Sequence, residues 1–459
     1  MFLPYSLHQS YTTVSATESG ISLDILFAEM SFFFRRLRKV SQKGSEKSVS
    51  SSLLSTETLV VPDIPSSVST DNLSHDDPER DTRIPSHTEQ SSSELTSPKP
   101  RIYPWSSRPL VLEQIPGRSN PDQTNSLPSS SPFPRHGHAV TQHVLDTGDI
   151  VLFGGFVGSE RSNDTFLISM ADRSTRLIEV NGTIPKPRIG HACASFSRIF
   201  ILWGGDVRSK GKTNPELDNA LYLLNIDTRE WTQVRTVGPV PSGRYGHTMC
   251  TIGTSLYLFG GQDGDNFFND VWRFELHTLK TFPRWQPIKP RLQSPLPERR
   301  TNHTCISYDN GIIIFGGTDH KYHYNDTWHF DPDDATWSKL DCVGYLMSPR
   351  EGHAAAQSKG FMYVFGGRDV EGKELGDIGA LRLSDKRWFM FQKLGPAPST
   401  RSGHCMASHG SQVVVFGGRS DSASTETTEE NVLYVLETKC IKFPVQKSKS
   451  SPPHNTNEA

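Results

Sequence analysis

The chain has 459 residues, and its 48 lysines and arginines nearly balance its 50 aspartates and glutamates, for a formal net charge of −2. This balance gives no general case for nucleic-acid binding, which needs a basic surface. No run of 18 apolar residues occurs, so the sequence predicts no membrane-spanning helix. Nothing between Ile21 and Phe34 resembles a secretory signal. The composition therefore indicates a cytoplasmic protein.

Residues 1–100 differ in composition from the rest of the chain. Serine, threonine, proline and charged residues dominate after position 40, and apolar residues are scattered. Such a segment buries too little apolar surface to offset the entropy of ordering, so we predict a disordered tail here. A second disordered tail is predicted over residues 448–459. Met30 is an alternative start of the protein, with residues 1–29 then an artefact of gene prediction.

One patch in the N-terminal tail combines three aromatic residues with four basic ones. Such a patch could bind weakly to an anionic membrane, where each cation contributes about 1 kcal/mol. The alternatives are a short partner-binding segment or a fortuitous cluster. The patch consists of Phe32, Phe33, Phe34, Arg35, Arg36, Arg38 and Lys39.

From residue 101 onward a repeat with a period near 50 residues organises the chain, and each copy has a short apolar run that ends in Gly-Gly. Apolar runs of four or five residues bounded by glycine are typical of buried strands. Two adjacent glycines let the backbone adopt positive φ and approach a neighbour closely. The six pairs are Gly154-Gly155, Gly204-Gly205, Gly260-Gly261, Gly316-Gly317, Gly366-Gly367 and Gly417-Gly418.

An Arg-x-Gly-His step precedes each apolar run, and a polar loop and an aromatic strand follow it. Only the fourth copy departs, with Asn302 in the glycine position. A large aromatic residue at a fixed place suits packing between radially arranged sheets, and Leu177 is predicted to hold that place in the first copy. The steps begin at Arg135, Arg188, Arg244, Arg300, Arg350 and Arg401, and the aromatic residues are Trp231, Trp285, Trp337 and Trp388.

These signals together resemble the kelch repeat over residues 101–444. The resemblance implies an all-β, six-bladed propeller with four strands per blade, which we assign to residues 101–447. Trp105 lies before the first repeat, whereas no tryptophan follows Tyr434 in the last. We therefore predict that residues 103–112 supply the outer strand of the last blade. Residues 441–445 are the alternative.

The repeated histidines and arginines recur once per blade, which indicates a structural role. We expect the arginines to form hydrogen bonds from blade to blade. Four of the six cysteines follow the repeated histidine closely, so they are predicted to be apolar fillers in buried strands. No Cys-x-x-Cys spacing suggests zinc or a disulfide framework.

Catalysis is not predicted. Galactose oxidases carry kelch-type blades, and their copper site needs two tyrosines, two histidines and a cysteine. The best cluster here is Tyr322-His323-Tyr324, and nothing else in the sequence completes it. No other catalytic motif is found. The sequence thus predicts neither a metal nor another cofactor.

Features that differ between blades are more informative about binding, because loops held by a rigid frame carry function. The loops after each second strand and the links between blades should emerge on one face. Aromatic residues with a nearby arginine are typical anchors for a protein partner. Alternatively, Phe267 and Phe268 begin a strand and pack against a neighbouring blade. The candidate partner-binding residues are Phe267, Phe268, Tyr322, His323, Tyr324 and Arg368.

Several segments are also similar to fungal cell-polarity kelch proteins, the cell-end markers and their cell-fusion relatives. They include Arg101–Ser106, Leu258–Gly264, Phe267–Asp270, Pro349–Ala354 and Arg387–Gln392. The resemblance implies a cytoplasmic scaffold at the cell cortex or growing tip that links cortex and cytoskeleton. Those relatives continue into coiled coils, which this sequence lacks, so the oligomeric state is left open.

Two other roles are known among kelch proteins. A ubiquitin-ligase adaptor would carry a folded domain of more than 100 residues before the propeller, and residues 1–100 are too polar to form one. A small-GTPase effector is a further alternative.

Overall fold

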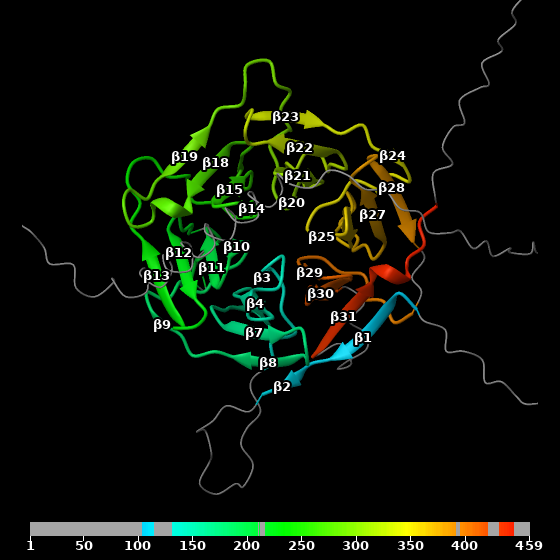
Figure 1. The fold of residues 1–459 in the computed structure, drawn as a ribbon, viewed down its shortest axis with the longest axis horizontal. Helices are drawn as coiled ribbons and strands as arrows, with labels where there is room; N and C mark the ends of the chain where they lie inside the picture. Colours follow the sequence, from blue (N-terminus) through cyan, green and yellow to red (C-terminus); the bar gives the residue numbers. More distant parts are fainter. Residues whose placement is uncertain are drawn as a thin grey trace, which may run out of the picture. The chain divides into compact units, whose positions relative to one another are not determined.

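Six small β-sheets are arranged radially around a central axis in the computed structural model (Figure 1). The structure describes residues 103–113, 131–209, 211, 216–391, 395–420 and 431–444. This arrangement confirms the six-bladed all-β propeller. The predicted tails, the aromatic-basic patch at residues 30–39 and the alternative start at Met30 lie outside the described residues. In the described part of the chain, no helix is long and apolar enough to cross a membrane.

The strands of each blade run from the axis outward. Blade 1 has β3 (Ala139–Val140), β4 (Asp149–Phe153), β7 (Thr165–Ser169), β8 (Ser174–Leu177) and β2 (Val111–Leu112), and blade 2 has β10 (Ala192–Phe196), β11 (Ile199–Trp203), β12 (Leu221–Asn225), β13 (Glu230–Val234) and β9 (Asn181–Gly182). Blade 3 has β14 (Thr248–Ile252), β15 (Ser255–Phe259), β18 (Val271–Glu275) and β19 (Trp285–Ile288), and blade 4 has β20 (Thr304–Tyr308), β21 (Gly311–Phe315), β22 (Thr327–Asp331) and β23 (Thr336–Lys339).

The last two blades follow the same order. Blade 5 has β25 (Ala354–Ser358), β26 (Phe361–Phe365), β27 (Ile378–Arg382), β28 (Arg387–Phe391) and β24 (Val343–Gly344), and blade 6 has β29 (Cys405–His409), β30 (Gln412–Phe416), β31 (Val432–Glu437) and β1 (Trp105–Pro109). Two short hairpins lie outside these sheets, β5 (Phe156–Val157) with β6 (Glu160–Arg161) and β16 (Gln262–Asp263) with β17 (Asn266–Phe267), and the described 3₁₀ helices are η1 (Leu276–Thr278) and η2 (Thr438–Cys440).

The prediction of four strands per blade is wrong for blades 1, 2 and 5. In each of them a two-residue strand from the link between blades pairs in parallel with the outer strand. Gly182 ends one of these strands with φ +80°, and a Cβ there would overlap the Trp231 carbonyl. Glycine therefore lets the link approach the edge strand closely enough to cover it.

The prediction that Leu177 takes the tryptophan position in blade 1 is also wrong. In the register of the sheets, Trp231 lies opposite Leu224 in blade 2, and the equivalent pair in blade 1 is Thr175 opposite Ile168. Thr175 is buried, whereas Leu177 is only half-buried. Trp231 follows its partner Leu224 by seven residues, and Thr175 follows Ile168 by the same number. Thr175 therefore takes the position of the tryptophan. Blade 1 therefore has a threonine where blade 2 has its tryptophan.

The ring is closed by the first described segment of the chain, as predicted. β1 pairs antiparallel with β31 over five residues, and Trp105 lies opposite Leu436 in blade 6. The alternative closure is not found, because Ile441–Pro444 forms no strand. Phe443 instead stacks on Phe361 with ring centroids 4.1 Å apart.

The first glycine of each Gly-Gly pair lies in close contact with the repeated histidine of the next blade. Gly204 has φ +72°, and a Cβ there would lie 2.5 Å from His247 Cε1 and 2.8 Å from the Arg244 carbonyl oxygen. The same fit joins Gly417 of blade 6 to His138 of blade 1. The two most regular features of the sequence thus form one repeated contact between blades.

We expect Gly204→Ala to lower the free energy of unfolding by about 3 kcal/mol, because it combines left-handed backbone strain with overlap against blade 3. Gly264→Ala is the matched control, since Gly264 has φ +55° but open space around its Cβ position, and it should cost about 1 kcal/mol. Urea unfolding of the variants measures the difference. If Gly204→Ala and Gly264→Ala lose the same free energy of unfolding, the close approach of Gly204 to His247 does not contribute to the cost.

A ring of backbone hydrogen bonds links the six Arg-x-Gly-His steps around the axis. Gly190 N–H donates to Gly137 O, Gly246 to Gly190 and Asn302 to Gly246, at 3.2, 2.8 and 2.8 Å. Gly352, Gly403 and Gly137 continue the ring at 2.9, 2.9 and 2.8 Å and so close it. Every donor has positive φ, which explains the fourth repeat, because asparagine is among the few other residues that adopt this conformation readily.

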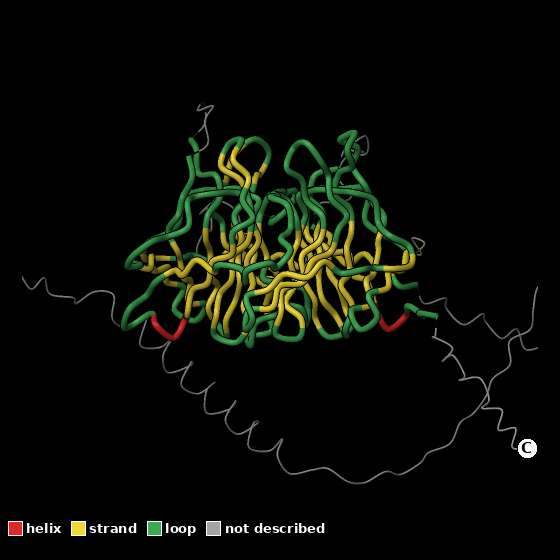
Figure 2. The backbone as a smooth tube through the Cα atoms, turned by 90° about the horizontal axis from the view of Figure 1, so that it is seen from above, coloured by secondary structure: helices red, strands yellow, loops and turns green. Residues whose placement is uncertain are grey.

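The propeller has two different faces. Figure 2 shows that short strands outside the blades rise among the loops on one side, whereas both 3₁₀ helices lie on the opposite side. We call the first side the loop face, and it is formed by the loops after each second strand and by the Arg-x-Gly-His steps.

Candidate functional site

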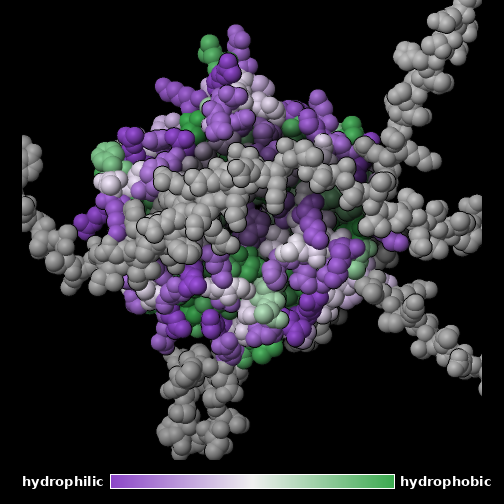
Figure 3. Space-filling model, viewed as in Figure 1, coloured by the Kyte–Doolittle hydropathy of each residue, from purple (hydrophilic) through white to green (hydrophobic). Residues whose placement is uncertain are grey.

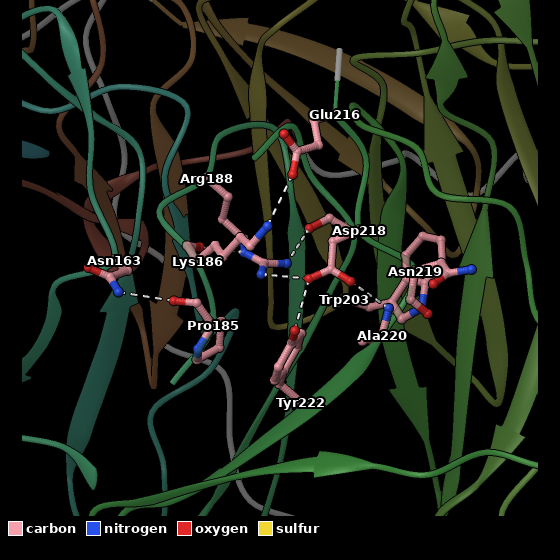
Figure 4. A network of polar contacts seen from close by, with 11 residues as sticks. Asn163, Pro185, Lys186, Arg188, Trp203, Glu216, Asp218, Asn219, Ala220 and Tyr222 are labelled. Carbon is pink, nitrogen blue, oxygen red and sulfur yellow. Dashed lines mark hydrogen bonds and ion pairs between the residues drawn. The ribbon is translucent and has the colours of Figure 1, made fainter. Parts of the chain in front are cut away.

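The repeated arginine of each blade is a buried structural clamp. In blade 2, the Arg188 side chain is fully buried, and its Nη2 lies 2.9 Å from Asp218 Oδ2 while Nη1 donates to Gly204 O at 2.8 Å (Figure 4). Tyr222 Oη also donates to Asp218, at 3.0 Å. The equivalent pairs are Arg135–Asp164, Arg244–Asp270, Arg300–Asp326 and Arg350–Asp377.

The prediction that these arginines join blade to blade is therefore wrong for their guanidinium groups, which bind within their own blade. It holds for their backbone, because Gly155 N–H of blade 1 donates to Arg188 O of blade 2 at 2.9 Å. A buried cation is stable only when paired and hydrogen-bonded, which explains why an aspartate accompanies the arginine in blades 1 to 5. The guanidinium groups of these five pairs are therefore buried and not available to a partner.

Two of the candidate binding residues cover such clamps. The Arg244 guanidinium carbon lies 3.8 Å from the centroid of the Phe268 ring, and that of Arg300 lies 4.4 Å from the Tyr324 ring. Tyr324 Oη donates to Asp319 at 2.9 Å, and burial together with this carboxylate raises the pKa of the tyrosine. Both rings thus stabilise their own blades.

The other candidates lie on neighbouring loops of blades 3, 4 and 5. Phe267 packs edge-on against His320, with ring centroids 4.8 Å apart. Tyr322 is 55% exposed at the tip of the loop of blade 4, with the Lys321 ammonium 5.0 Å from its ring centroid. The structure thus brings aromatic groups of blades 3 and 4 together on the loop face.

Arg368 and His323 meet at a carboxylate that the sequence did not single out. Glu351 Oε1 lies 3.3 Å from Arg368 Nη2 and 3.9 Å from His323 Nε2. Asn302 Nδ2 donates to Glu351 Oε2 at 3.0 Å. Glu351 therefore connects blades 4 and 5 on the loop face. It also holds the Arg368 side chain, which is 41% exposed.

Glu351 belongs to a ring of positions of which sequence reasoning singled out only Arg368. The residue between arginine and glycine in each Arg-x-Gly-His step forms an antiparallel bridge with the residue after Gly-Gly. Because these twelve positions lie beside the most regular ones and yet differ from blade to blade, their variation could have revealed the ring. The six pairs are His136–Phe156, Ile189–Asp206, Tyr245–Gln262, Thr301–Thr318, Glu351–Arg368 and Ser402–Arg419.

The axis holds a small cavity of about 170 Å³, lined by the six repeated histidines and the residues after them. Gln142 of blade 1 reaches across it, and its Nε2 donates to the Cys305 carbonyl of blade 4, the opposite blade, at 3.0 Å. Cys193, Cys305 and Cys405 also line the cavity, and none of the six cysteines is paired. Cys193, Cys250, Cys305 and Cys405 lie in the inner strands β10, β14, β20 and β29, which agrees with the prediction that these four are fillers.

The six histidines are buried, and three of them, His191, His353 and His404, donate Nε2–H to a backbone carbonyl of the preceding blade. His191 Nε2 donates to Phe153 O of the preceding blade at 3.1 Å, and burial lowers the pKa of His191 to about 3. Within the described ranges, no group of three or more histidine, cysteine, aspartate or glutamate side chains is placed to hold a metal ion. Tyr322 and Tyr324 also face different surroundings, so the Tyr322-His323-Tyr324 cluster does not converge.

Comparisons with known proteins agree with this architecture. A family model described as the KLHDC2/KLHL20/DRC7 Kelch-repeats domain matches residues 190–418 and 348–457, which together exceed half of the chain. Tip elongation aberrant protein 1 of Schizosaccharomyces pombe is 34% identical over 335 residues, which are 72% of this chain and 28% of that protein. Kelch repeat-containing protein 2 of Saccharomyces cerevisiae is 33% identical over 331 residues, which are 67% of this chain and 37% of that protein.

Human Kelch domain-containing protein 3 is 28% identical over 298 residues, 59% of this chain and 74% of that protein. The chain spans about a third of the length of the two yeast proteins. The chain therefore belongs to the KLHDC2/KLHL20/DRC7 kelch-repeat family, and it is related to the cell-polarity kelch proteins of the two yeasts.

Proposed function

We propose that the chain is a non-catalytic scaffold of polarised growth that binds protein partners through the loop face of its propeller. The observation that carries this proposal is the similarity to the two yeast polarity proteins, which extends over 72% and 67% of the chain. Because it covers the propeller, any shared role rests on that domain. The setting that follows is the cytoplasmic cortex or growing tip.

The chemistry of the loop face supports a protein partner. Tyr322 is largely exposed, Phe267 lies beside His320, and Arg368 is held in place by Glu351. Tyrosine and arginine are the residues that most often dominate binding energy at protein interfaces. On the opposite face, the visible part of Figure 3 shows small hydrophobic areas scattered among hydrophilic side chains. Tyr322, Phe267 and Arg368 of the loop face are thus the better candidates for binding a protein partner.

The N-terminal patch would act as a second, separate determinant. Phe32, Phe33 and Phe34, beside four basic residues, would add weak contact with an anionic membrane at the cortex. The propeller would then select the partner while the patch supports the location.

Live-cell imaging of a fluorescently tagged chain in a polarised fungal cell tests the proposal. We expect enrichment at tips or bud necks, weakened by Tyr322→Ser with Phe267→Ser. The variant Phe32→Ser, Phe33→Ser, Phe34→Ser reports separately on the patch. Phe282→Ser is the matched control, since Phe282 is 49% exposed and follows η1 on the side away from the loop face. An even cytosolic distribution of the parent chain would contradict a polarity role.

A further inference from the structure

The link that leads into blade 4 covers the outer strand of that blade with a side chain. In blades 1, 2 and 5 a backbone N–H of the link donates to the backbone oxygen at the tryptophan position. These bonds are Glu113 to Thr175, Thr183 to Trp231 and Tyr345 to Trp388, at 3.0, 2.7 and 3.1 Å. In blade 4, Ser294 Oγ accepts from Trp337 N–H at 2.8 Å, and its own proton can go to Trp337 O or Pro295 O, both at 3.2 Å. One hydroxyl thus contacts both backbone groups of Trp337.

A turn in this link explains the difference. Arg291 N–H donates to Ala335 O at 2.8 Å, but Ser294 N–H then bonds back to Arg291 O at 3.0 Å. Between them, Gln293 has φ +70° and Leu292 is 90% exposed. The turn therefore uses the backbone N–H of Ser294 within the link and leaves its hydroxyl to cover β23. Figure 1 shows the link at the periphery of the ring, between β19 and β23.

Ser294 is followed by proline, and one class of protein kinases requires proline directly after the serine that they modify. Proline lacks an N–H and fixes its φ near −65°, so a kinase pocket can select it. In the described part of the chain, Ser-Pro steps begin at Ser131, Ser294 and Ser348. A kinase binds several residues on both sides of the acceptor, so the exposure of the neighbours distinguishes the three serines.

The neighbours of Ser294 are exposed on both sides, at the three residues before it and the two after it. By contrast, Ser131 is followed by two buried residues. The Ser348 hydroxyl accepts a hydrogen bond from the buried Arg350 guanidinium at 2.8 Å, and the residue before Ser348 is buried as well. Of the three serines, Ser294 is therefore the one that a kinase can reach with the least disturbance of the blade.

We infer that Ser294 is a phosphorylation site for a proline-directed protein kinase and that its modification uncovers the outer edge of blade 4. The γ-phosphoryl group of ATP is transferred to Ser294 Oγ: a P–O bond forms to Oγ, and the bond from the γ-phosphorus to the bridging oxygen breaks, which releases ADP. The hydroxyl proton passes to the catalytic aspartate of the kinase.

A phosphoserine cannot keep both contacts of the hydroxyl. It carries a charge of about −1.5 to −2 at neutral pH, and its oxygens accept hydrogen bonds. It therefore no longer donates to Trp337 O and repels that oxygen, so the link moves away from β23. An uncovered edge strand is a template for pairing with another chain. This site lies on the outer strand of blade 4 and is independent of the partner proposed for the loop face.

A kinase reaction on the full chain, with magnesium, ATP and a purified mitogen-activated protein kinase, tests the site, and mass spectrometry maps the phosphate. We expect Ser294 to be modified at least about tenfold faster than Ser131 and Ser348, because those two require local unfolding. Pro295→Ala should abolish modification of Ser294. No phosphate on Ser294 in the chain, when a peptide of residues 289–299 is modified or not, would overturn the inference, as would equal modification of Pro295→Ala.

Hydrogen exchange separates the modification from its effect on the blade. Phosphorylation should speed exchange of the Trp337 amide by up to about tenfold, the effect of losing one hydrogen bond. Ser294→Ala should do the same without the kinase, and Ser338→Ala, which changes an exposed serine of the same strand, should not. Unchanged exchange at Trp337 after complete modification of Ser294 would show that the edge stays covered and would overturn the inferred effect.

Discussion

Lowering the pH from 7 to 5 is expected to destabilise the propeller strongly, because six buried histidines must remain neutral for it to fold. Burial is the main cause that lowers their pKa, with the adjacent clamp arginine next in each case. For His191 and His404 the pKa falls to about 3. The unfolded chain titrates these groups near the ordinary value of about 6.5.

The sign of the effect follows from proton binding. Since the folded pKa is depressed, the unfolded state binds more protons below pH 6.5, and stability is lost as the pH falls from about 6.5 toward 3. At pH 5 a single histidine with a folded pKa near 3 costs roughly 2 kcal/mol. His191 and His404 together would cost roughly 4 kcal/mol, and the other four histidines, whose pKa burial also lowers, add to this loss. The sum is large beside the roughly 5–15 kcal/mol that usually stabilises a domain.

Urea unfolding at a series of pH values measures this effect. The free energy of unfolding should fall steeply between pH 6.5 and 5, with a slope that corresponds to several protons taken up on unfolding. His404→Gln should reduce the slope by about one proton, because the amide can still donate toward Phe365 O, which accepts from His404 at 3.1 Å. A flat stability profile over this range would contradict the assignment of neutral histidines.

The repeat itself could be predicted from the sequence because each of its features performs one structural task. The glycine pairs make room for the histidine of the next blade, as at Gly204 and His247, and both must therefore occur at the same place in every copy. The same reasoning correctly predicted that Trp105 belongs to the last blade. A sequence feature that recurs in every blade thus indicates a structural contact that every blade makes.

The remaining features depend on contacts that spacing does not encode. A repeated arginine can reach an acceptor in its own blade or in the neighbouring blade, and the spacing in the sequence does not tell which. Only the structure shows that Arg188 pairs with Asp218 of its own blade. The bond of Gln142 across the axis joins residues 163 positions apart, and among the described residues it is found in blade 1 only. Phe268 and Tyr324 look like exposed anchors in the sequence, and only the structure shows them over Arg244 and Arg300.

Trp105→Ala is expected to lower the free energy of unfolding by about 3–5 kcal/mol, the usual range for loss of a buried tryptophan. Trp105 is 2% exposed, packs edge-on against Phe365 at 5.8 Å, and lies in the strand that completes blade 6. Its loss would therefore weaken both the core between blades 5 and 6 and the closure of the ring. Tyr103→Ala is the control two residues away, because Tyr103 is 47% exposed and should change stability by no more than about 0.5 kcal/mol.

Hydrogen exchange can distinguish local opening from global loss of stability. If β1 holds the last blade closed, Trp105→Ala should speed exchange in β31 more than in β12, which occupies the same place in blade 2. Without β1, all of β31 would become an unpaired edge, so this strand protects blade 6 from edge-to-edge association. Equal exchange in β31 and β12, with a stability equal to that of Tyr103→Ala, would mean that closure does not depend on β1.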